Sequence, residues 1–255
     1  MKMTKPNSAE TVALQALAWL AGNEELWPVF QGASGAGADD LRNGATDPAE
    51  SFLLRICGND TERAAQAGAV IGFDLHTRSF SRDSIVIAGT AQEVATALAP
   101  YFPELPMPDL LATLNEEAAK APQAEAVPLI PLLTNLRARG LKLGVATNDA
   151  QVPARAHLNG AGVSGYFDFI AGFDSGHGGK PAPGQLLAFC ADTGLEPGAV
   201  VMVGDSTHDL HAGRAAGMRT VAVLTGLADT ATLSPLADVV LPDIGHLAAW
   251  LDAQA

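Results

Sequence analysis

The spacing of apolar residues divides the chain into a helical first part and a second part in which strands and helices alternate. Residues 9–30 repeat apolar side chains at helical intervals, which predicts one amphipathic helix or two short ones. The next segment, QGASGAGADDLRNGATDPAE, is rich in Gly, Ala and Asp and is typical of a loop. We therefore expect a helical N-terminal segment over residues 1–50, with a boundary near 47–51, and no sheet strand within residues 1–46.

The middle region, residues 51–124, is also mostly helical in its pattern. Two segments, TAQEVATALAPYF and DLLATLNEEAAKA, carry apolar residues at positions i, i+3, i+4 and i+7. They are bounded by Pro103, Pro106, Pro108 and Pro122, and proline interrupts helices because it lacks a backbone N–H. The pattern predicts a second helical region here.

Strands and helices alternate over residues 125–255. Four helical segments separate apolar runs near 142–147, 167–171, 199–204 and 219–224, and a last run, ADVVLP, follows. The run AVVMVG is continuously apolar, as central parallel strands require. This order predicts an α/β domain whose parallel sheet is covered by helices on both faces. Ligands of such sheets bind beyond the carboxyl ends of the strands.

Composition and charge exclude several classes of function. The net charge of −13 argues against a nucleic-acid-binding surface, which needs clustered Lys and Arg. Cys57 and Cys190 match no metal or redox spacing, and the six His residues form no HxxxH pair, so we expect free thiols and no zinc. No apolar run is long enough to cross a bilayer, and MKMTKPNSAE has no apolar signal core. We therefore expect a cytoplasmic protein without a membrane partner.

The strongest polar signal follows the apolar run AVVMVG. Asp205 stands directly after this predicted strand, Gly204 allows a tight turn, and Asp209 follows four residues later. The spacing places one carboxylate at the strand tip and one in the first helical turn. Hard oxygen ligands of this kind suit Mg2+, which is commonly held by one or two carboxylates with phosphate and water. The alternative, that Asp205 only caps the helix, explains one aspartate but not the pair.

Two further polar segments lie near predicted strand ends. Thr147 and Asn148 follow the strand LKLGVAT, where a hydroxyl and backbone N–H groups can hold phosphate oxygens. Lys180 stands in the glycine-rich segment GHGGKPAPGQ, and its ammonium group can neutralise a phosphoryl group. Taken singly, the first is common turn chemistry and the second a solvated lysine. Taken together, they predict phosphate binding by Thr147, Asn148 and Lys180.

The segments VATN, GGKPAP and VGDSTHDL occur in that order and resemble motifs two, three and four of the haloacid dehalogenase superfamily. The closest branch is the phosphoglycolate-phosphatase-like one, which has a helical cap. The resemblance covers residues 125–255 and implies a Rossmann-like core and Mg2+-dependent hydrolysis of a small phosphorylated metabolite. It also implies catalytic roles for Thr147 and Lys180, with Thr147 binding the phosphoryl group, Lys180 supporting nucleophile and phosphate, and Asp205 and Asp209 positioning the metal.

The first motif of that family, an apolar strand ending in Asp-x-Asp-Gly-Thr, has no match in this sequence. Its first Asp attacks phosphorus and its second transfers a proton. In one interpretation Asp74, in AVIGFDLHTRS, is a degenerate nucleophile with His76 in place of the second Asp. In the other, which we favour, residues 52–122 are the cap and the nucleophile strand has been lost, either by a natural fusion and deletion or through an error in the gene model. Residues 1–49 resemble a small bacterial helical family of unknown function.

Three hypotheses about function follow. The first is an active phosphatase that uses Asp74. The second is a catalytically impaired relative that binds Mg2+ and phosphate in a regulatory or vestigial role. The third is a receiver-like or nucleotide-binding α/β module, which we rank last because the chain has neither a GxGxxG loop nor a Walker motif.

Overall fold

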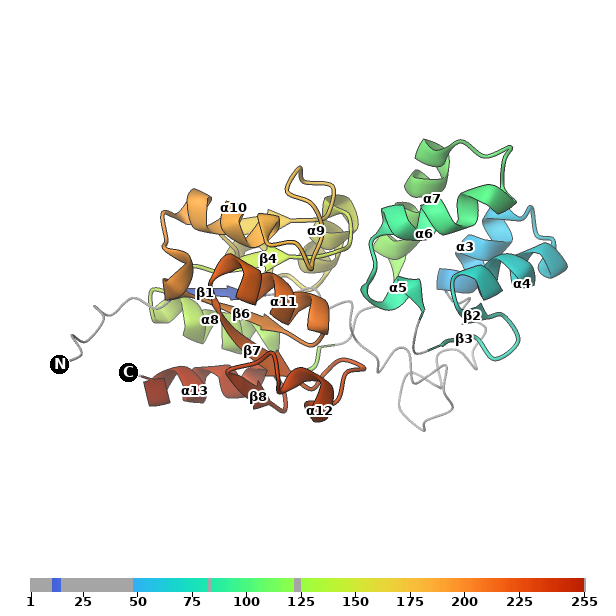
Figure 1. The fold of residues 1–255 in the computed structure, drawn as a ribbon. Helices are drawn as coiled ribbons and strands as arrows, with labels where there is room; N and C mark the ends of the chain where they lie inside the picture. The colour runs from blue at the N-terminus through green and yellow to red at the C-terminus, as the bar shows by residue number, and fades with distance from the viewer. Residues whose placement is uncertain (1–10, 15–47, 82–83, 122–124, 255) are drawn as a thin grey trace.

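The computed structural model of the chain describes residues 11–14, 48–81, 84–121 and 125–254. It has two parts, an α/β core and a helical cap, which are seen side by side in Figure 1. The core contains residues 11–14 and 125–254, and the cap contains residues 48–121. No helix in these ranges is long and apolar enough to cross a membrane.

The core is built on parallel strands. β6 pairs with β1 on one side and with β7 on the other, β7 pairs with β8, and β4 pairs separately with β5. β1 lies next to β4, so the spatial order is β5-β4-β1-β6-β7-β8. The strands are β1 (Thr11–Leu14), β4 (Gly144–Ala146), β5 (Phe169–Ala171), β6 (Val200–Gly204), β7 (Arg219–Val223) and β8 (Val239–Leu241). The five strands expected from the sequence are therefore confirmed.

β1 overturns one expectation. We expected no strand within residues 1–46, but Thr11–Leu14 pair in parallel with β6, with Leu14 opposite Val203. A short apolar run is compatible with either helix or strand, and here an available strand edge on β6 decides between them. Of the rest of the predicted N-terminal helical segment, residues 1–10 and 15–47 lie outside the described residues.

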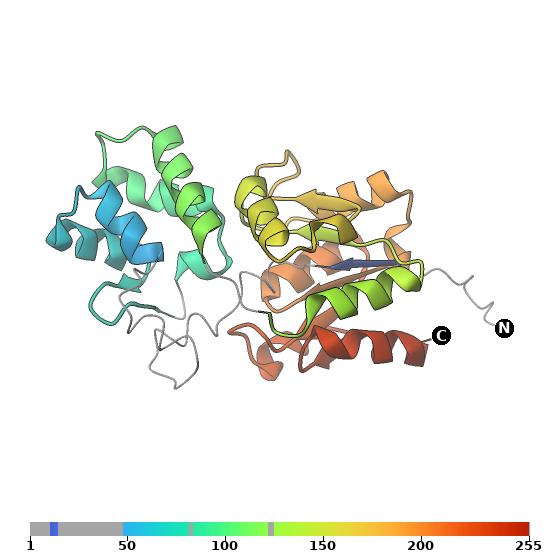
Figure 2. The ribbon, with the colours of Figure 1, turned by 180° about the vertical axis from the view of Figure 1, so that it is seen from behind.

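Helices cover both faces of the sheet, as the alternating pattern predicted. One face packs against α8 (Leu129–Ala138), α9 (Gln151–Gly160) and α13 (Leu247–Gln254). The other packs against α10 (Gly184–Thr193) and α11 (Thr207–Ala216), with α12 (Thr230–Leu233) near β7 and β8. Short 3-10 turns at Ser164–Tyr166, Pro197–Ala199 and Ile244–His246 connect these elements. Figure 2 shows α8 and α13 in front of the sheet and α10 and α11 behind it.

The burial of β6 explains its continuously apolar sequence. Val201 and Val203 contribute to the hydrophobic cluster with α8, whereas Val200 and Met202 contribute to the cluster with α10 and α11. Successive side chains of a strand point to opposite faces, and both faces are covered here. β6 therefore lies inside the core and carries Asp205 at its carboxyl end.

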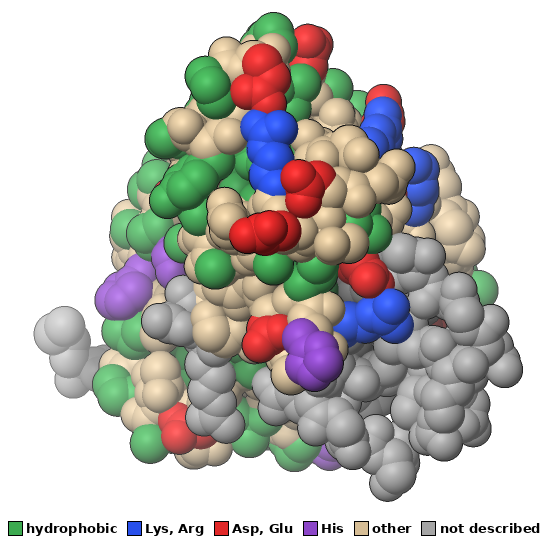
Figure 3. All heavy atoms as spheres, turned by 90° about the vertical axis from the view of Figure 1, so that its right-hand side faces the viewer, with side chains coloured by type: hydrophobic (Ala, Val, Ile, Leu, Met, Phe, Trp, Pro, Cys, Tyr) green, Lys and Arg blue, Asp and Glu red, His purple; other side chains and the backbone are tan. Residues whose placement is uncertain are grey.

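The cap has a hydrophobic core of its own. Phe52, Leu53, Leu98, Phe102 and Leu110 are among its buried residues. Arg55 pairs with Glu116 and Glu117 of α7. Figure 3 shows basic side chains next to acidic ones on the outer side of the cap. Its elements are α3 (Pro48–Ile56), α4 (Thr61–Val70), β2 (Phe73–Asp74), β3 (Ser79–Phe80), α5 (Ile85–Ala88), α6 (Ala91–Leu98), a 3-10 turn at Ala99–Tyr101 and α7 (Met107–Lys120).

The cap contacts the core at α9 and at the loop before Lys180. α7 packs against α9, and a ring nitrogen of the buried His157, Nε2, lies 2.8 Å from the carbonyl oxygen of Ala118. At the other place the methyl group of Thr90, just before α6, lies so close to Gly179 that a Cβ there would be 2.9 Å from it. The cap thus approaches the loop that carries Lys180.

Candidate functional site

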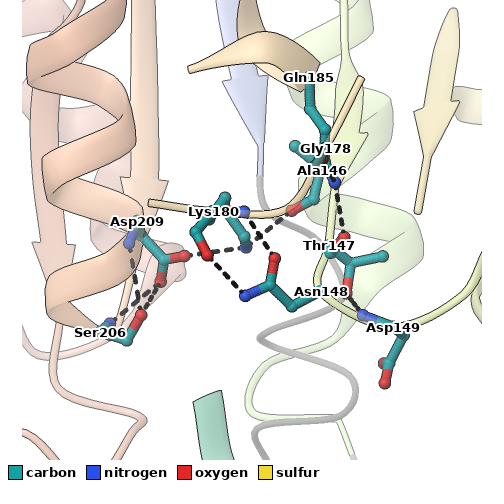
Figure 4. A network of polar contacts seen from close by, with 9 residues as sticks. All are labelled: Ala146, Thr147, Asn148, Asp149, Gly178, Lys180, Gln185, Ser206 and Asp209. Atoms are coloured by element: carbon teal, nitrogen blue, oxygen red, sulfur yellow. Dashed lines mark hydrogen bonds and ion pairs between the residues drawn. The ribbon is translucent and has the colours of Figure 1, made fainter. Parts of the chain in front are cut away.

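A buried ion pair joins two of the three polar segments. Lys180 Nζ lies 2.8 Å from Asp209 Oδ1, and the side chains are only 2% and 1% exposed. The same ammonium group donates a hydrogen bond of 2.9 Å to the carbonyl oxygen of Ala146, the last residue of β4. Figure 4 shows these groups meeting between the ends of two strands. The structure therefore brings the three sequence motifs together at one edge of the sheet.

Asp209 is held by the first turn of α11. Its Oδ2 accepts hydrogen bonds from the backbone N–H of Ser206 at 3.1 Å and from the Ser206 hydroxyl at 2.8 Å. Ser206 in turn accepts a bond from the Asp209 backbone N–H, so the two residues form a capping box. A Cβ at Gly204 would lie 2.3 Å from Asp209 Cβ, so only glycine leaves room for this carboxylate. We did not single out Ser206 from the sequence, although S-x-x-D is a recognisable capping signal.

Asp205 stands one residue after β6 and is 7% exposed. The loop that follows β7 lies against its side chain, because a Cβ at Gly226 would be 2.7 Å from Asp205 Cγ. A glycine here allows the close approach of backbone to carboxylate. Asp205 is therefore enclosed between β6 and the loop that follows the neighbouring strand.

Thr147 follows β4 and is 4% exposed. Its hydroxyl oxygen accepts a 3.0 Å hydrogen bond from the backbone N–H of Asp149, and its own N–H donates to the carbonyl of Ala171. A threonine hydroxyl carries one donor proton besides its acceptor sites. The arrangement thus fixes the hydroxyl oxygen at the strand end with its proton available to an anion.

Asn148 braces Lys180. Its Oδ1 accepts a 2.7 Å bond from the backbone N–H of Lys180, and its Nδ2 donates a 2.9 Å bond to the carbonyl of the same residue. The side chain to which we assigned phosphate binding is therefore engaged at both ends with another loop. What it contributes in this geometry is the position of Lys180.

Gln185, at the start of α10, is a site residue that the sequence reading missed. It is fully buried, and its Nε2 donates to the carbonyls of Thr147 and Gly178. The only signal in the sequence is one polar side chain in the otherwise apolar segment GQLLAF. Gln185 is the last residue of the segment GHGGKPAPGQ, but we assigned a role only to Lys180 in that segment.

Asp149 lies beside this network and has an altered acidity. Burial raises the pKa of its carboxyl group above the usual range, and electrostatic interactions with His157 and Lys180 offset part of the rise. Burial disfavours the charged form of a carboxyl group. In Figure 4 its carboxyl group points away from Lys180 and Asp209.

Asp74 lies in the cap, not at the sheet edge. It belongs to β2, which pairs antiparallel with β3 in a small hairpin, and both ribbon views place this hairpin apart from the parallel sheet. Its Oδ1 accepts hydrogen bonds from the backbone N–H groups of His76 and Thr77 at 2.8 and 3.0 Å. These bonds, that from Thr77 first, hold its pKa below the usual value. In this structure Asp74 therefore does not lie with Thr147 at the end of the parallel sheet.

The donor set at the sheet edge has two carboxylates. Asp205 and Asp209 supply hard oxygen ligands, but one oxygen of Asp209 already faces Lys180 and the other faces Ser206. Across the described ranges, no three His, Cys, Asp or Glu side chains gather to hold an ion. The pair fits a magnesium ion that takes phosphate oxygens and water for the rest of its shell.

Two family models match this chain. The model described as haloacid dehalogenase-like hydrolase matches residues 80–223, which include all three polar segments. A second model, described as a protein of unknown function (DUF3572), matches residues 6–56, a range that contains β1. The boundary between the two regions falls in the cap.

Curated relatives and solved structures agree with the first match. A phosphoglycolate phosphatase from Rhodospirillum rubrum is 37% identical over 122 residues, or 48% of this chain and 51% of the relative. A pyrophosphatase from Bacillus pumilus is 32% identical over 111 residues, or 44% and 51% of the two chains. The chain thus spans about half the length of these relatives. A crystal structure titled as a predicted phosphoglycolate phosphatase from Haemophilus somnus superposes with a TM-score of 0.60 at 18% identity, covering 80% of this chain and 92% of that one.

Proposed function

Because this chain belongs to the haloacid dehalogenase-like hydrolase family, we propose that its sheet edge binds the phosphoryl group of a small phosphomonoester together with Mg2+. The observation that carries this proposal is the buried contact of Lys180 with both Asp209 and the end of β4. The proposed ligand groups are a hydroxyl, an ammonium group and two carboxylates near the carboxyl ends of β4 and β6, where ligands of α/β sheets bind. Those four groups are Thr147, Lys180, Asp205 and Asp209.

Each residue has a distinct part in the proposed site. The Thr147 hydroxyl donates to a phosphoryl oxygen, and the Lys180 ammonium group neutralises negative charge beside it. Asp205 and Asp209 hold the magnesium ion, which, when bound, supplies neutralisation of charge on the phosphoryl oxygens. Asn148 holds Lys180 in place through the two bonds to its backbone.

We also propose that the protein hydrolyses phosphomonoesters only weakly, because its sequence has no match to the attacking aspartate of the family's first motif. β1 lies between β4 and β6, and its carboxyl end therefore lies between Thr147 and Asp205. In the family's first motif an apolar strand ends in Asp-x-Asp, whereas TVAL is followed in this sequence by Gln-Ala-Leu. Without a nucleophile, charge neutralisation remains but the covalent step does not occur.

Phosphoglycolate is the first substrate to test, since several matched relatives are named phosphoglycolate phosphatase. The pyrophosphatase among the relatives shows that the matched half is shared by enzymes named for different substrates. We therefore propose a small phosphomonoester as the class of ligand and leave the selection among such esters to the cap. A cytoplasmic location stays a prediction.

Calorimetric titration with inorganic phosphate, with and without Mg2+, tests the binding proposal. We expect wild-type protein to bind phosphate more tightly with Mg2+ present, and Asp205→Asn to lose that dependence. Asp192→Asn, on the exposed face of α10, is the matched control and should behave as wild type. The proposal is wrong if phosphate does not bind, or if Asp205→Asn keeps the full effect of Mg2+.

A second candidate, a fully active phosphatase, is favoured by the names of the curated relatives alone. Hydrolysis of phosphoglycolate and p-nitrophenyl phosphate separates the two. We expect turnover near background in wild type and Asp74→Asn alike. Ordinary phosphatase turnover, roughly 1–1000 per second, would establish the second candidate instead.

A further inference from the structure

One fully buried side chain ties the two proposed phosphate-binding loops together. Gln185 Nε2 donates a 2.9 Å hydrogen bond to the carbonyl oxygen of Thr147 and another of 2.9 Å to that of Gly178. Thr147 belongs to the loop after β4, and Gly178 stands two residues before Lys180. A single amide group therefore fixes the distance between the backbone that carries the hydroxyl and the backbone that carries the ammonium group.

The orientation of this amide follows from its neighbours. A side-chain oxygen in the place of Nε2 would face two carbonyl oxygens, and all three groups only accept hydrogen bonds. With Nε2 in that place both donor protons are used. Gln185 Oε1 is then a buried oxygen without a hydrogen-bond partner in the described structure. The contact uses the two donors of the amide and leaves its acceptor unsatisfied, which is an unfavourable arrangement for a group that serves packing alone.

The conformation of Gly178 makes the Lys180 loop dependent on contacts from side chains outside the loop. Its φ of +75° lies in the left-handed region, which glycine adopts readily and other residues rarely do. Such a backbone has no preference of its own for one geometry, so side-chain contacts must select it. Asn148 selects the position of Lys180 itself, and Gln185 selects the position of Gly178.

We propose that Gln185 is a positioning residue for the proposed phosphate-binding site. It holds the Thr147 and Lys180 loops at the separation that a phosphoryl group requires. This inference rests on the proposed function, because it assumes that these loops bind phosphate. Gln185 acts through the two backbone carbonyls and makes no contact with the ligand. Removal of its donors weakens phosphate binding beyond any loss of stability.

The test is Gln185→Met, which keeps the length of the side chain and removes both donors. Gln151→Met is the matched control, because Gln151 Nε2 also donates to a backbone carbonyl, that of Ile170, without joining the two loops. Inorganic phosphate is titrated calorimetrically at fixed Mg2+, and thermal melting is recorded without phosphate. We expect a phosphate affinity at least tenfold weaker in Gln185→Met and unchanged in Gln151→Met.

Hydrogen–deuterium exchange reports on the contact without any ligand. We expect faster exchange in Gln185→Met at residues 147–150 and 178–180, and unchanged exchange in β6 and β7. If Gln185→Met does not fold, Gln185→Asn replaces it, since the shorter amide cannot span both carbonyls. It should weaken phosphate binding in the same direction.

Each outcome has one meaning. A lower melting temperature with unchanged phosphate affinity would overturn the positioning role and leave Gln185 as a packing residue. Unchanged exchange in both loops would overturn it as well. A wild-type protein that does not bind phosphate would overturn the proposed function instead, and the exchange rates would still decide whether Gln185 holds the loops.

Discussion

At the residue scale, the Lys180–Asp209 ion pair is buried in the core, so the stability of the protein depends on keeping both partners. Both charges are almost fully removed from water, and a buried charge that loses its partner is costly. We expect Lys180→Met to lower the free energy of unfolding by about 3–5 kcal/mol, because it leaves the Asp209 carboxylate uncompensated. Urea denaturation followed by circular dichroism measures this.

The double variant Lys180→Met/Asp209→Leu is the control for that loss. Removing both charges removes the uncompensated carboxylate, so the double variant should be more stable than Lys180→Met alone. If the loss of stability in the double variant equals the sum of the losses in Lys180→Met and Asp209→Leu, the two residues are not coupled, contrary to the 2.8 Å contact.

Gly204→Ala tests the close approach of Asp209 to the strand end. The added Cβ would lie 2.3 Å from Asp209 Cβ and 2.5 Å from its Oδ2, so the first turn of α11 must shift. We expect a loss of about 1–3 kcal/mol of stability and loss of the magnesium effect on phosphate binding. Gly160→Ala, where a Cβ meets nothing within 4 Å, should cost no stability. Calorimetry that shows normal magnesium dependence in Gly204→Ala would contradict the geometry.

The sequence was enough to propose four site residues. Thr147 and Asp205 follow apolar runs, Lys180 stands in a glycine-rich loop, and Asp209 comes four residues after Asp205. The sequence could not identify Gln185, whose partners are 38 and 7 residues away, because no local pattern records which carbonyls a side chain reaches. The same limit applies to Asn148. Its residue type indicated a phosphate ligand, but its contacts with Lys180, 32 residues away, depend on how the two loops fold together.

At the scale of elements, Asp168 joins the helix α8 to the beginning of β4. Its carboxylate accepts bonds from the backbone N–H of Leu143 at 3.0 Å and from Lys142 at 3.1 Å, and it pairs with Arg137 of α8. Burial alone would raise the pKa of Asp168, but these contacts outweigh burial and the pKa lies below its usual value. The ionised form therefore stabilises the junction.

Asp168→Asn should lower the free energy of unfolding by about 1–3 kcal/mol at neutral pH. The folded-state pKa is lowered, so the stabilisation is complete above the unfolded pKa of about 3.9 and disappears as pH falls through the folded value. Denaturation curves of both proteins from pH 7 to acid should converge below about pH 4. A difference that is independent of pH would exclude the charge as its cause.

The elements themselves were predictable wherever the pattern was long or repeated. The strands near β4, β5, β6, β7 and β8 follow from apolar runs between helices, and each lies where expected. β1 was not predictable from its own sequence, because TVAL stands in a segment whose apolar residues also fit a helix. The free edge of β6, formed by residues almost two hundred positions later, determines its conformation.

At the scale of the whole molecule, the core depends on the segment that carries β1. Deletion of residues 1–46 would expose the edge of β6, a strand whose five residues are all buried. An open, apolar strand edge promotes aggregation. We expect the deleted protein to melt at a lower temperature and to form aggregates in light scattering.

Deletion of residues 1–9, which keeps β1, is the control and should behave as the full chain does. The cap provides a second comparison within the same molecule, since its buried residues form a hydrophobic cluster separate from that of the core. If the chain lacking residues 1–46 melts like the full chain and stays monomeric, the pairing of β1 with β6 does not contribute to stability.

The pairing of Thr11 with Val200 also sets the order in which the protein is assembled during synthesis. Residues 11–14 emerge from the ribosome while their partner strand has not yet been translated. Pairings so distant in sequence form late and slow the folding of the chain. Until then the apolar segment TVAL has no β6 beside it, and exposed apolar segments of this kind make nascent proteins dependent on chaperones. The strand that stands where a nucleophile is expected therefore also makes the completion of the sheet one of the last events in the production of the molecule.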